Sequence, residues 1–271
     1  MKLKRIGIVG CGVIGAKIAE AVGWDLKGKA KLSALYDVDC AKARDVSGKL
    51  RKKNLVVSSL AELIRKSDLV VEAASAKVSA DIARKALRAK RDCLIMSVGG
   101  LLKAGDIFNL AKKKNCFVYV PSGAIAGIDA LKAHKLADIE KVTLTTRKSP
   151  QALSGAPYII KKRIDLDSIK KETVIFAGSA KKAAAFFPQN INVAAVLSLA
   201  GIGKEKTRVK IVCSPGYSRN IHEIEIESSA GKTFIRCENN PCPDNPKTSY
   251  LAVLSAIAVL KEIFEPVKIG T

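Results

Sequence analysis

Several features that mark other classes of protein are missing or scarce in this sequence. No stretch approaches the roughly 18 consecutive apolar residues that a membrane span requires, and no apolar core with a cleavage site follows the N-terminus, so we expect neither a transmembrane segment nor a signal peptide. Cysteine never occurs as a CxxC pair, and the two histidines, His134 and His222, have no cysteine or second histidine at ligand spacing. We therefore expect a reduced, cytoplasmic protein without a metal site.

Aromatic residues are few, and acidic residues are outnumbered by basic ones. The chain has 47 Lys and Arg against 25 Asp and Glu, a formal net charge of +22, which raises the question of a nucleic-acid partner. The 13 aromatic residues, the lack of any Lys/Arg run longer than three and the lack of an RNP-like or helix-turn-helix pattern argue against that partner. The excess is spread over both halves of the chain. We expect a basic surface that attracts an anionic small molecule, and no nucleic-acid or membrane partner.

The pattern of apolar residues changes near residue 121 of the 271. Before it, apolar runs alternate with helix-like segments, which is typical of a parallel sheet covered on both faces. After it, consecutive segments alternate apolar and polar residues, which is typical of a mostly antiparallel or mixed sheet. We predict an α/β protein with a doubly wound Rossmann domain over residues 1–122, completed by a C-terminal helix, 246–271, and a second α+β domain over 123–245 that binds substrate and mediates dimerisation.

The elements behind this prediction follow from the periodicity of the apolar residues. The predicted strands are 5–10, 32–37, 55–57, 68–74, 92–98 and 116–123 in the first domain, and 141–147, 173–177, 207–213, 221–228 and 232–238 in the second. The predicted helices are 13–23, 41–50, 61–67, 78–89, 103–114, 180–186, 191–200 and 249–264, the last of which we expect to pack on the first domain.

A glycine-rich turn, GCGVIG, follows the first predicted strand and opens the first predicted helix. Its first glycine permits the tight turn, its second lets a pyrophosphate approach the backbone, and its third allows close packing of helix on strand. The helix N-terminus adds the positive end of a dipole. The pattern predicts a dinucleotide site at Gly10, Cys11, Gly12, Val13, Ile14 and Gly15.

An acidic residue at the end of the second predicted strand completes this site. Asp37 lies 22 residues after Gly15 and is placed to accept hydrogen bonds from the adenosine ribose. Because its carboxylate would repel a 2′-phosphate, we expect NAD, with NADP as an alternative that Lys42 and Arg44 leave open. Cys11, beside the pyrophosphate, should make the protein sensitive to thiol reagents. The alternative to the whole assignment is a packing turn followed by a strand-end aspartate.

Five further segments, in content and order, resemble the L-aspartate dehydrogenase family. They are VEAAS (71–75), VPSGAIAGID (120–129), FPQNINVA (187–194), RNIH (219–222) and NPKTS (245–249). The resemblance runs from about residue 5 to about residue 265. It implies oxidation of L-aspartate to iminoaspartate with NAD(P), followed by hydrolysis to oxaloacetate and ammonia or by use in the biosynthesis of NAD.

The resemblance also implies roles for single residues. In the family, the histidine of the Asn-Ile-His segment is catalytic, which is His222 here. Ala124 and Asn190 occupy the positions that contact the dinucleotide, and Ala74 and Ser75 are assigned to the same cofactor site.

His222 can also be interpreted from its own surroundings. In the alternating segment IHEIEIES it shares the apolar face with Ile224 and Ile226, where a histidine is more often a satisfied core residue than a catalyst. Transfer of a hydride from Cα requires the substrate amine to lose a proton, and attack of water on the imine requires a base. A histidine with an ordinary pKa of about 6.5 serves both steps. We expect His222 to be this acid/base group.

Aspartate carries two carboxylates, so its pocket should offer cationic, amide or hydroxyl donors. We expect Lys247 and Thr248 to bind substrate, together with Ser122 and Asn192. The alternatives are a solvated turn that caps the last helix at 247–249, and a helix cap at Asn192.

Two other functions stay open at this point. A dihydrodipicolinate reductase-like or homoserine dehydrogenase-like enzyme would share the first 120 residues, although the RNIH and NPKT segments argue against it. A non-catalytic dinucleotide-sensing protein that binds nucleic acid would account for the charge. Because an exposed β face in the second domain would pair well with its copy, we expect a homodimer.

Overall fold

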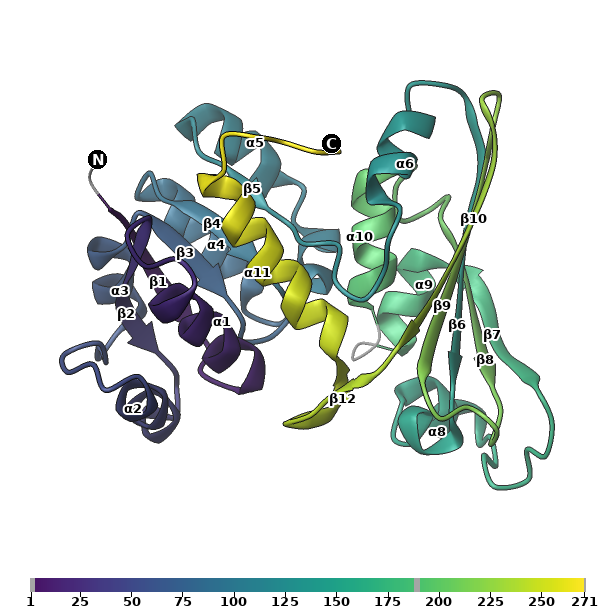
Figure 1. The fold of residues 1–271 in the computed structure, drawn as a ribbon. Helices are drawn as coiled ribbons and strands as arrows, with labels where there is room; N and C mark the ends of the chain where they lie inside the picture. Colours follow the sequence, from purple (N-terminus) through teal and green to yellow (C-terminus); the bar gives the residue numbers. More distant parts are fainter. Residues whose placement is uncertain (1–2, 188–190, 271) are drawn as a thin grey trace. The chain divides into compact units, whose positions relative to one another are not determined.

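The computed structural model describes residues 3–187 and 191–270, with only the backbone described at Pro246 and Lys247. The chain forms two compact units, coloured along the sequence in Figure 1. The first comprises the chain up to Pro121 together with Val253–Val267, and the second comprises Ser122–Ala252 and the C-terminal residues. In the described part of the chain, no helix has the length and apolarity needed to cross a membrane.

The first unit is built on a parallel sheet with strand order β2-β1-β3-β4-β5. A parallel bridge between Leu35 and Val56 extends the sheet beyond β2, which produces the 3-2-1-4-5-6 order of a Rossmann fold. The doubly wound sheet predicted from the sequence is confirmed. The strands are β1 (Lys4–Val9), β2 (Ala30–Tyr36), β3 (Leu69–Glu72), β4 (Asp92–Ile95) and β5 (Val118–Tyr119).

Helices cover both faces of this sheet, which is why its strands are almost continuous apolar runs. On one face, Ile18 and Val22 of α1 share a core with Ile6 and Ile8 of β1, and Leu260 of α11 joins the same core from the far end of the sequence (Figure 1). The helices of this unit are α1 (Val13–Trp24), α2 (Cys40–Lys49), α3 (Leu60–Lys66), α4 (Ser79–Arg88), the 3-10 helix η1 (Val98–Lys103), α5 (Asp106–Lys114) and α11 (Tyr250–Phe264).

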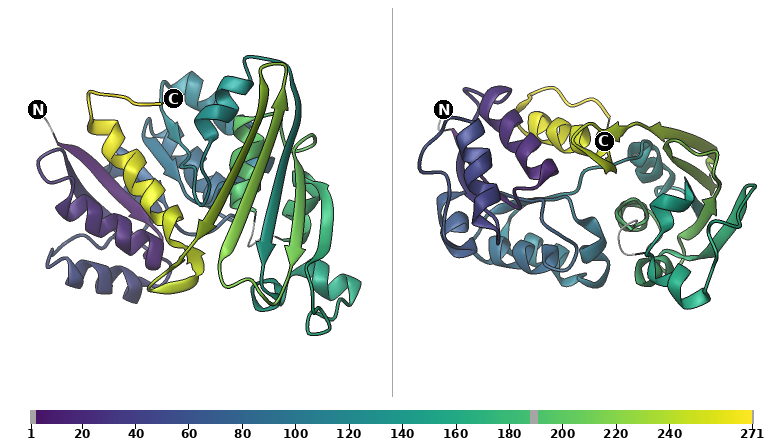
Figure 2. Two further views of the ribbon diagram at one scale, coloured as in Figure 1. Left: turned by 45° about the vertical axis from the view of Figure 1, so that its right-hand side comes forward. Right: turned by 90° about the horizontal axis from the view of Figure 1, so that it is seen from below.

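The second unit contains a mixed sheet with strand order β10-β9-β6-β8-β7. All neighbouring strands are antiparallel except β6 and β8, so the predicted mixed sheet is confirmed. Helices α6, α9 and α10 lie on one side of it (Figures 1 and 2). The strands are β6 (Ile139–Lys148), β7 (Thr173–Ser179), β8 (Arg208–Cys213), β9 (Asn220–Ser228) and β10 (Gly231–Asn239), and the helices are α6 (Ile128–His134), α7 (Pro150–Leu153), α8 (Pro157–Lys162), α9 (Ala180–Phe186) and α10 (Asn192–Ala200).

The other face of this sheet carries a row of ion pairs. Glu223, Glu225 and Glu227 alternate along β9 and pair with bases on the strands at both sides. Arg147 on β6 lies 3.0 Å from Glu223, and Lys232 on β10 lies 2.8 Å from Glu227. Because side chains alternate between the two faces of a strand, this row places His222, between Ile221 and Glu223, on the face that the helices cover.

The last helix, predicted over 249–264, is confirmed over Tyr250–Phe264, whereas the segment before it, which the domain division included in a C-terminal helix 246–271, is not helical. Residues Asn245–Ser249 form strand β12, which pairs with β11 (Pro241–Cys242) in a short hairpin, and the helix begins at Tyr250. A residue before proline is biased towards extended backbone, so Pro246 favours a strand at Asn245 where the sequence pattern suggested a capped turn. The short helices α7 and α8 were also not predicted, although each has a proline in its first turn.

Candidate functional site

The three glycines of the turn differ in what surrounds them. Gly10 has φ +91°, and a Cβ there would lie 2.5 Å from the carbonyl oxygen of Ala73. A Cβ at Gly15 would lie 1.9 Å from the carbonyl oxygen of Gly10, so any side chain would separate helix α1 from the turn. A Cβ at Gly12 would meet nothing within 4 Å. Gly10 and Gly15 are therefore required by the close packing of the turn. The space beside Gly12, at the N-terminus of α1, is open and fits a pyrophosphate.

Asp37 lies directly beside this turn. Its Oδ2 accepts a hydrogen bond of 2.7 Å from the backbone N–H of Cys11, and its Oδ1 accepts one of 2.9 Å from the N–H of Asp39. The carboxylate is thus held in one orientation, half-buried, at the end of β2. The structure brings Asp37 and the turn together as the sequence spacing predicts.

Cys11 does not have the reactivity expected of it. Its side chain is 5% exposed, and burial, reinforced by the charge of Asp37, raises the pKa of its thiol to about 12. Because the thiolate is the reactive form, Cys11 stays protonated and inert at neutral pH. The burial and the raised pKa of this thiol contradict the prediction, based on its place beside the pyrophosphate, that Cys11 reacts with thiol reagents.

A buried carboxylate supports the loops next to the turn. Glu72, fully buried at the end of β3, accepts hydrogen bonds from the backbone N–H groups of Ala74 at 2.8 Å and Ser97 at 2.9 Å. Burial raises the pKa of Glu72, while these donors and the N–H of Ser75 act in the opposite direction. Glu72 therefore joins the loop after β3, where Ala74 and Ser75 are exposed, to the end of β4. This role is not visible in the sequence, because a glutamate in an apolar run does not reveal its partners.

In the second unit, His222 is buried, as are two other polar side chains on the same face of the sheet, Thr146 and Lys148. It is 5% exposed, and its Nδ1 lies 3.1 Å from Oγ1 of Thr146, the residue directly opposite on β6. Burial and, next, the charge of Lys148 lower the pKa of His222 to about 3. The expected pKa near the ordinary value is therefore wrong for the protein without substrate, where His222 is a neutral imidazole.

Lys148 is a second residue that the sequence analysis missed. It is two positions beyond Thr146 on β6, so both side chains lie on the covered face, and it is 9% exposed. Burial lowers the pKa of its ammonium group to about 8. Perturbed pKa values of this kind concentrate at functional sites. The signal in the sequence was the alternation of Leu144, Thr146 and Lys148, which sets a lysine on an apolar face.

The remaining predicted residues have different places. The carbonyl oxygen of Ala124 accepts a hydrogen bond of 2.9 Å from Asn239, which pairs with Asn220 two residues before His222. Ser122 is half-buried at the start of this loop.

Asn192 is the first residue of α10, after the cap residue Ile191, so it is not the helix cap. Thr248 accepts a hydrogen bond of 3.1 Å from the amide of Asn245 within strand β12. Asn190 and the side chain of Lys247 lie outside the described residues.

Comparison with known proteins agrees with both halves of this description. The family model for the C-terminal domain of aspartate dehydrogenase matches residues 129–263, and the model for the NAD-binding domain of homoserine dehydrogenase matches residues 10–121. The L-aspartate dehydrogenase of Methanosarcina acetivorans is 47% identical over 98% of this chain and 99% of its own. The chain belongs to the L-aspartate dehydrogenase family. It is accordingly an oxidoreductase that uses a nicotinamide dinucleotide.

Other members and neighbours extend this assignment. The L-aspartate dehydrogenase of Nitrosopumilus maritimus is 42% identical over 99% of this chain and 100% of its own. The crystal structure of aspartate dehydrogenase from Thermotoga maritima superposes with a TM-score of 0.73 at 27% identity, covering 99% of this chain and all of that one. A homoserine dehydrogenase from Thiobacillus denitrificans has a TM-score of 0.63 at 14% identity over 97% of this chain and 74% of its own, which shows a shared fold alone.

Proposed function

We propose that the protein oxidises L-aspartate to iminoaspartate, with NAD preferred over NADP, and that water converts the imine to oxaloacetate and ammonia. The observation that carries this proposal is the near-full-length similarity to L-aspartate dehydrogenases at 42–47% identity. When bound, the nicotinamide supplies the acceptor for the hydride that leaves Cα. The iminoaspartate that escapes hydrolysis is a substrate for an enzyme that builds the pyridine ring of NAD.

The preference for NAD follows from Asp37. Its carboxylate is fixed by two backbone donors beside the glycine turn, where it would accept hydrogen bonds from a ribose and repel a 2′-phosphate. The pyrophosphate would be held by the turn residues Gly10, Cys11, Gly12, Val13, Ile14 and Gly15. The rest of the cofactor site would be formed by Ala74, Ser75, Ala124 and Asn190. The substrate would be contacted by Ser122, Asn192, Lys247 and Thr248.

His222 is the acid/base group of this proposal. As a neutral imidazole, it can accept the proton that the substrate amine releases and later return a proton during hydrolysis. Its contact with Thr146 orients the ring, because Nδ1 is engaged at 3.1 Å, and we assign the proton transfer to Nε2. We expect His222→Ala to lower kcat about 10²- to 10⁴-fold. Turnover within threefold of the wild type would exclude this role.

The experiment that tests the function is a panel of L-amino acids with both cofactors. We expect NADH formation from L-aspartate and little from homoserine, glutamate or alanine, and we expect NADP to bind at least tenfold more weakly than NAD. Oxidation of homoserine in place of aspartate would support the homoserine dehydrogenase-like alternative. A salt-dependent shift with duplex DNA, without turnover, would support a dinucleotide-sensing protein.

The homodimer would form through the face of the second sheet that carries the ion pairs. Phe234 on β10 and Val174 on β7 lie on this face, 62% and 60% exposed. Since Glu223, Glu225 and Glu227 are each paired with a base, the face presents apolar side chains beside neutralised carboxylates, which suits a second copy of itself. We expect twice the chain mass in sedimentation, and a monomer for Phe234→Lys. The seven free cysteines fit a cytoplasmic location.

A further inference from the structure

Lys148 is unusual among the charged side chains of the second unit. Of the Lys, Arg, Asp and Glu residues described there, it is the one that is buried. It ends strand β6 on the same face as Thr146 and next to the pair that Thr146 makes with His222. Lysines are rarely buried, and those with a displaced pKa concentrate at functional sites.

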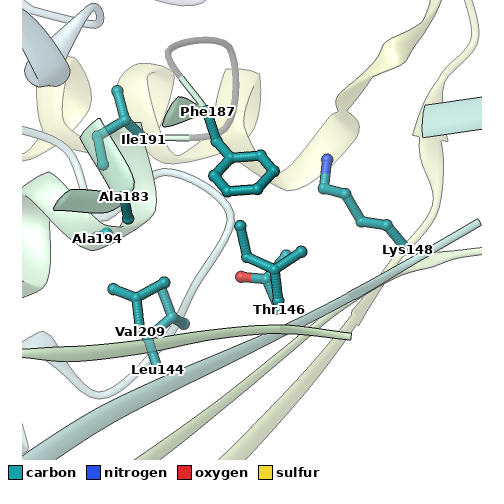
Figure 3. Close-up of a pocket in the computed structure, with 9 residues that line it drawn as sticks. Leu144, Thr146, Lys148, Ala183, Phe187, Ile191, Ala194 and Val209 are labelled. Atoms are coloured by element: carbon teal, nitrogen blue, oxygen red, sulfur yellow. The ribbon is translucent and has the colours of Figure 1, made fainter. Parts of the chain in front are cut away.

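The surroundings of Lys148 are mostly apolar. It lines a pocket together with Thr146, while the remaining lining comes from Phe187, Ile191 and aliphatic residues of β6, β8, α9 and α10. Figure 3 shows the Lys148 side chain at the edge of this pocket, with its nitrogen extending beside Phe187. An apolar lining strengthens electrostatic interactions, so an anion bound here would be attracted strongly.

A proton on Lys148 makes a proton on His222 less favourable, because both side chains would then carry a positive charge. The charge of Lys148 lowers the pKa of His222, and burial lowers the pKa of both groups. The ionisable groups next to them on the neighbouring strands are two thiols. Cys237 on β10 lies opposite His222, and Cys213 on β8 lies opposite Lys148. Helix α10 carries no ionisable residue, and those of the other covering helices are Lys181 and Lys182 of α9 and Asp129, Lys132 and His134 of α6.

We propose that Lys148 binds a carboxylate of the substrate and that this binding makes His222 able to take up a proton. The inference rests on the proposed function, because that function supplies a dicarboxylate. An opposite charge within about 4–6 Å raises the pKa of a lysine by about 1 to 3 and removes its repulsion of a neighbouring imidazolium. A carboxylate at Lys148 would therefore offset one of the two causes that lower the pKa of His222, the other being burial, and make its imidazole a better acceptor for the amine proton of aspartate.

The test is calorimetric titration of the full chain, saturated with NAD, with succinate, a dicarboxylate that has no amine to oxidise. Run at pH 8 in two buffers of different ionisation enthalpy, it reports the protons taken up with each succinate. Because the pKa of Lys148 is about 8, we expect uptake of about half a proton per site in the wild type. At pH 6, where Lys148 is already protonated, succinate that binds as the dianion releases its own protons, so the contribution of His222 is the difference in proton uptake between the wild type and His222→Asn, which we expect to be positive.

Three variants separate binding from titration. Lys148→Met should weaken succinate binding at least tenfold and abolish proton uptake at pH 8. Lys148→Arg should bind succinate within a few-fold of the wild type without uptake at pH 8, because a guanidinium is already charged. Lys210→Met, on the other face of the same sheet, should behave as the wild type. Circular dichroism spectra of the variants, compared with that of the wild type, check that each is folded.

Succinate binding by Lys148→Met within threefold of the wild type, or no uptake at pH 8 in the wild type, would overturn the inference. Turnover of L-aspartate by the same wild-type sample distinguishes the two failures. With turnover present, a failed succinate arm rejects the role of Lys148 alone. Without turnover the proposed function fails, and Lys148-dependent succinate binding would then still support the carboxylate site.

Discussion

At the scale of single residues, three acidic or basic side chains of the described residues are buried where an ordinary globular core would hold apolar ones. Glu72 is buried in the first unit, and His222 and Lys148 are buried in the second. Each has a pKa displaced in the direction that burial dictates. Glu72 holds loops by hydrogen bonds. Lys148 lines a pocket of mostly apolar side chains, and His222 pairs with Thr146, another residue of that lining.

Replacing Glu72 by Gln should show how much the loops next to the turn depend on a carboxylate. The amide group would face at least one backbone N–H with a donor of its own, which leaves a buried donor unsatisfied and costs about 1–3 kcal/mol. We expect a lower Tm and weaker NAD binding. Asp45→Asn, on an exposed i,i+4 pair with Lys49, is the matched control and should change neither. Equal Tm values for the two variants would contradict the role of Glu72.

The buried imidazole predicts sensitivity to acid. His222 in the unfolded chain binds a proton near the ordinary pKa of about 6.5, whereas in the folded protein it resists protonation down to about 3. Between these values the unfolded state binds more protons, so stability falls as the pH is lowered through this window. We expect His222→Asn to lose less stability than the wild type between pH 6.5 and pH 4 in urea unfolding. Parallel curves for the two proteins would contradict it.

At the scale of elements, the glycine turn offers a matched pair of variants. Gly12→Ala adds a Cβ in open space, so it should leave the Tm unchanged but weaken NAD binding at least tenfold, because that Cβ would occupy the approach of the pyrophosphate. Gly10→Ala places a Cβ 2.5 Å from a carbonyl oxygen at φ +91° and should lower the Tm. Normal NAD binding by Gly12→Ala would mean that the pyrophosphate lies elsewhere.

Most helices and strands were predictable from the sequence, because the apolar residues within each repeat with the period of a helix or of a strand. The turn and strands β1 and β9 have local patterns that fix their type and face. Strand β12 and the short helices were not predictable, since a two-strand hairpin and single turns lack a repeating pattern. Glu72 and Lys148 were missed for a different reason: what a charged side chain meets depends on register and on distant loops, not on its neighbours in sequence.

At the scale of the whole molecule, the formal charge of +22 is the property that no single site explains. If it steers an anionic substrate and cofactor, kcat/KM should fall as ionic strength rises from about 10 mM to about 150 mM, while kcat barely changes, because screening acts on encounter rather than on chemistry. Steady-state rates with L-aspartate at several NaCl concentrations measure this. A parallel loss of kcat would indicate damage to the site instead of steering.

Helix α11 places the two ends of the sequence in one core. Ala256 and Leu260 are fully buried against residues of α1, β1 and β2, yet they are synthesised more than a hundred residues after β5. During translation, part of the apolar surface of the dinucleotide-binding unit therefore stays uncovered until the second unit has been synthesised. The second unit, encoded between the two parts of the first, can therefore fold before the unit that begins the chain is complete.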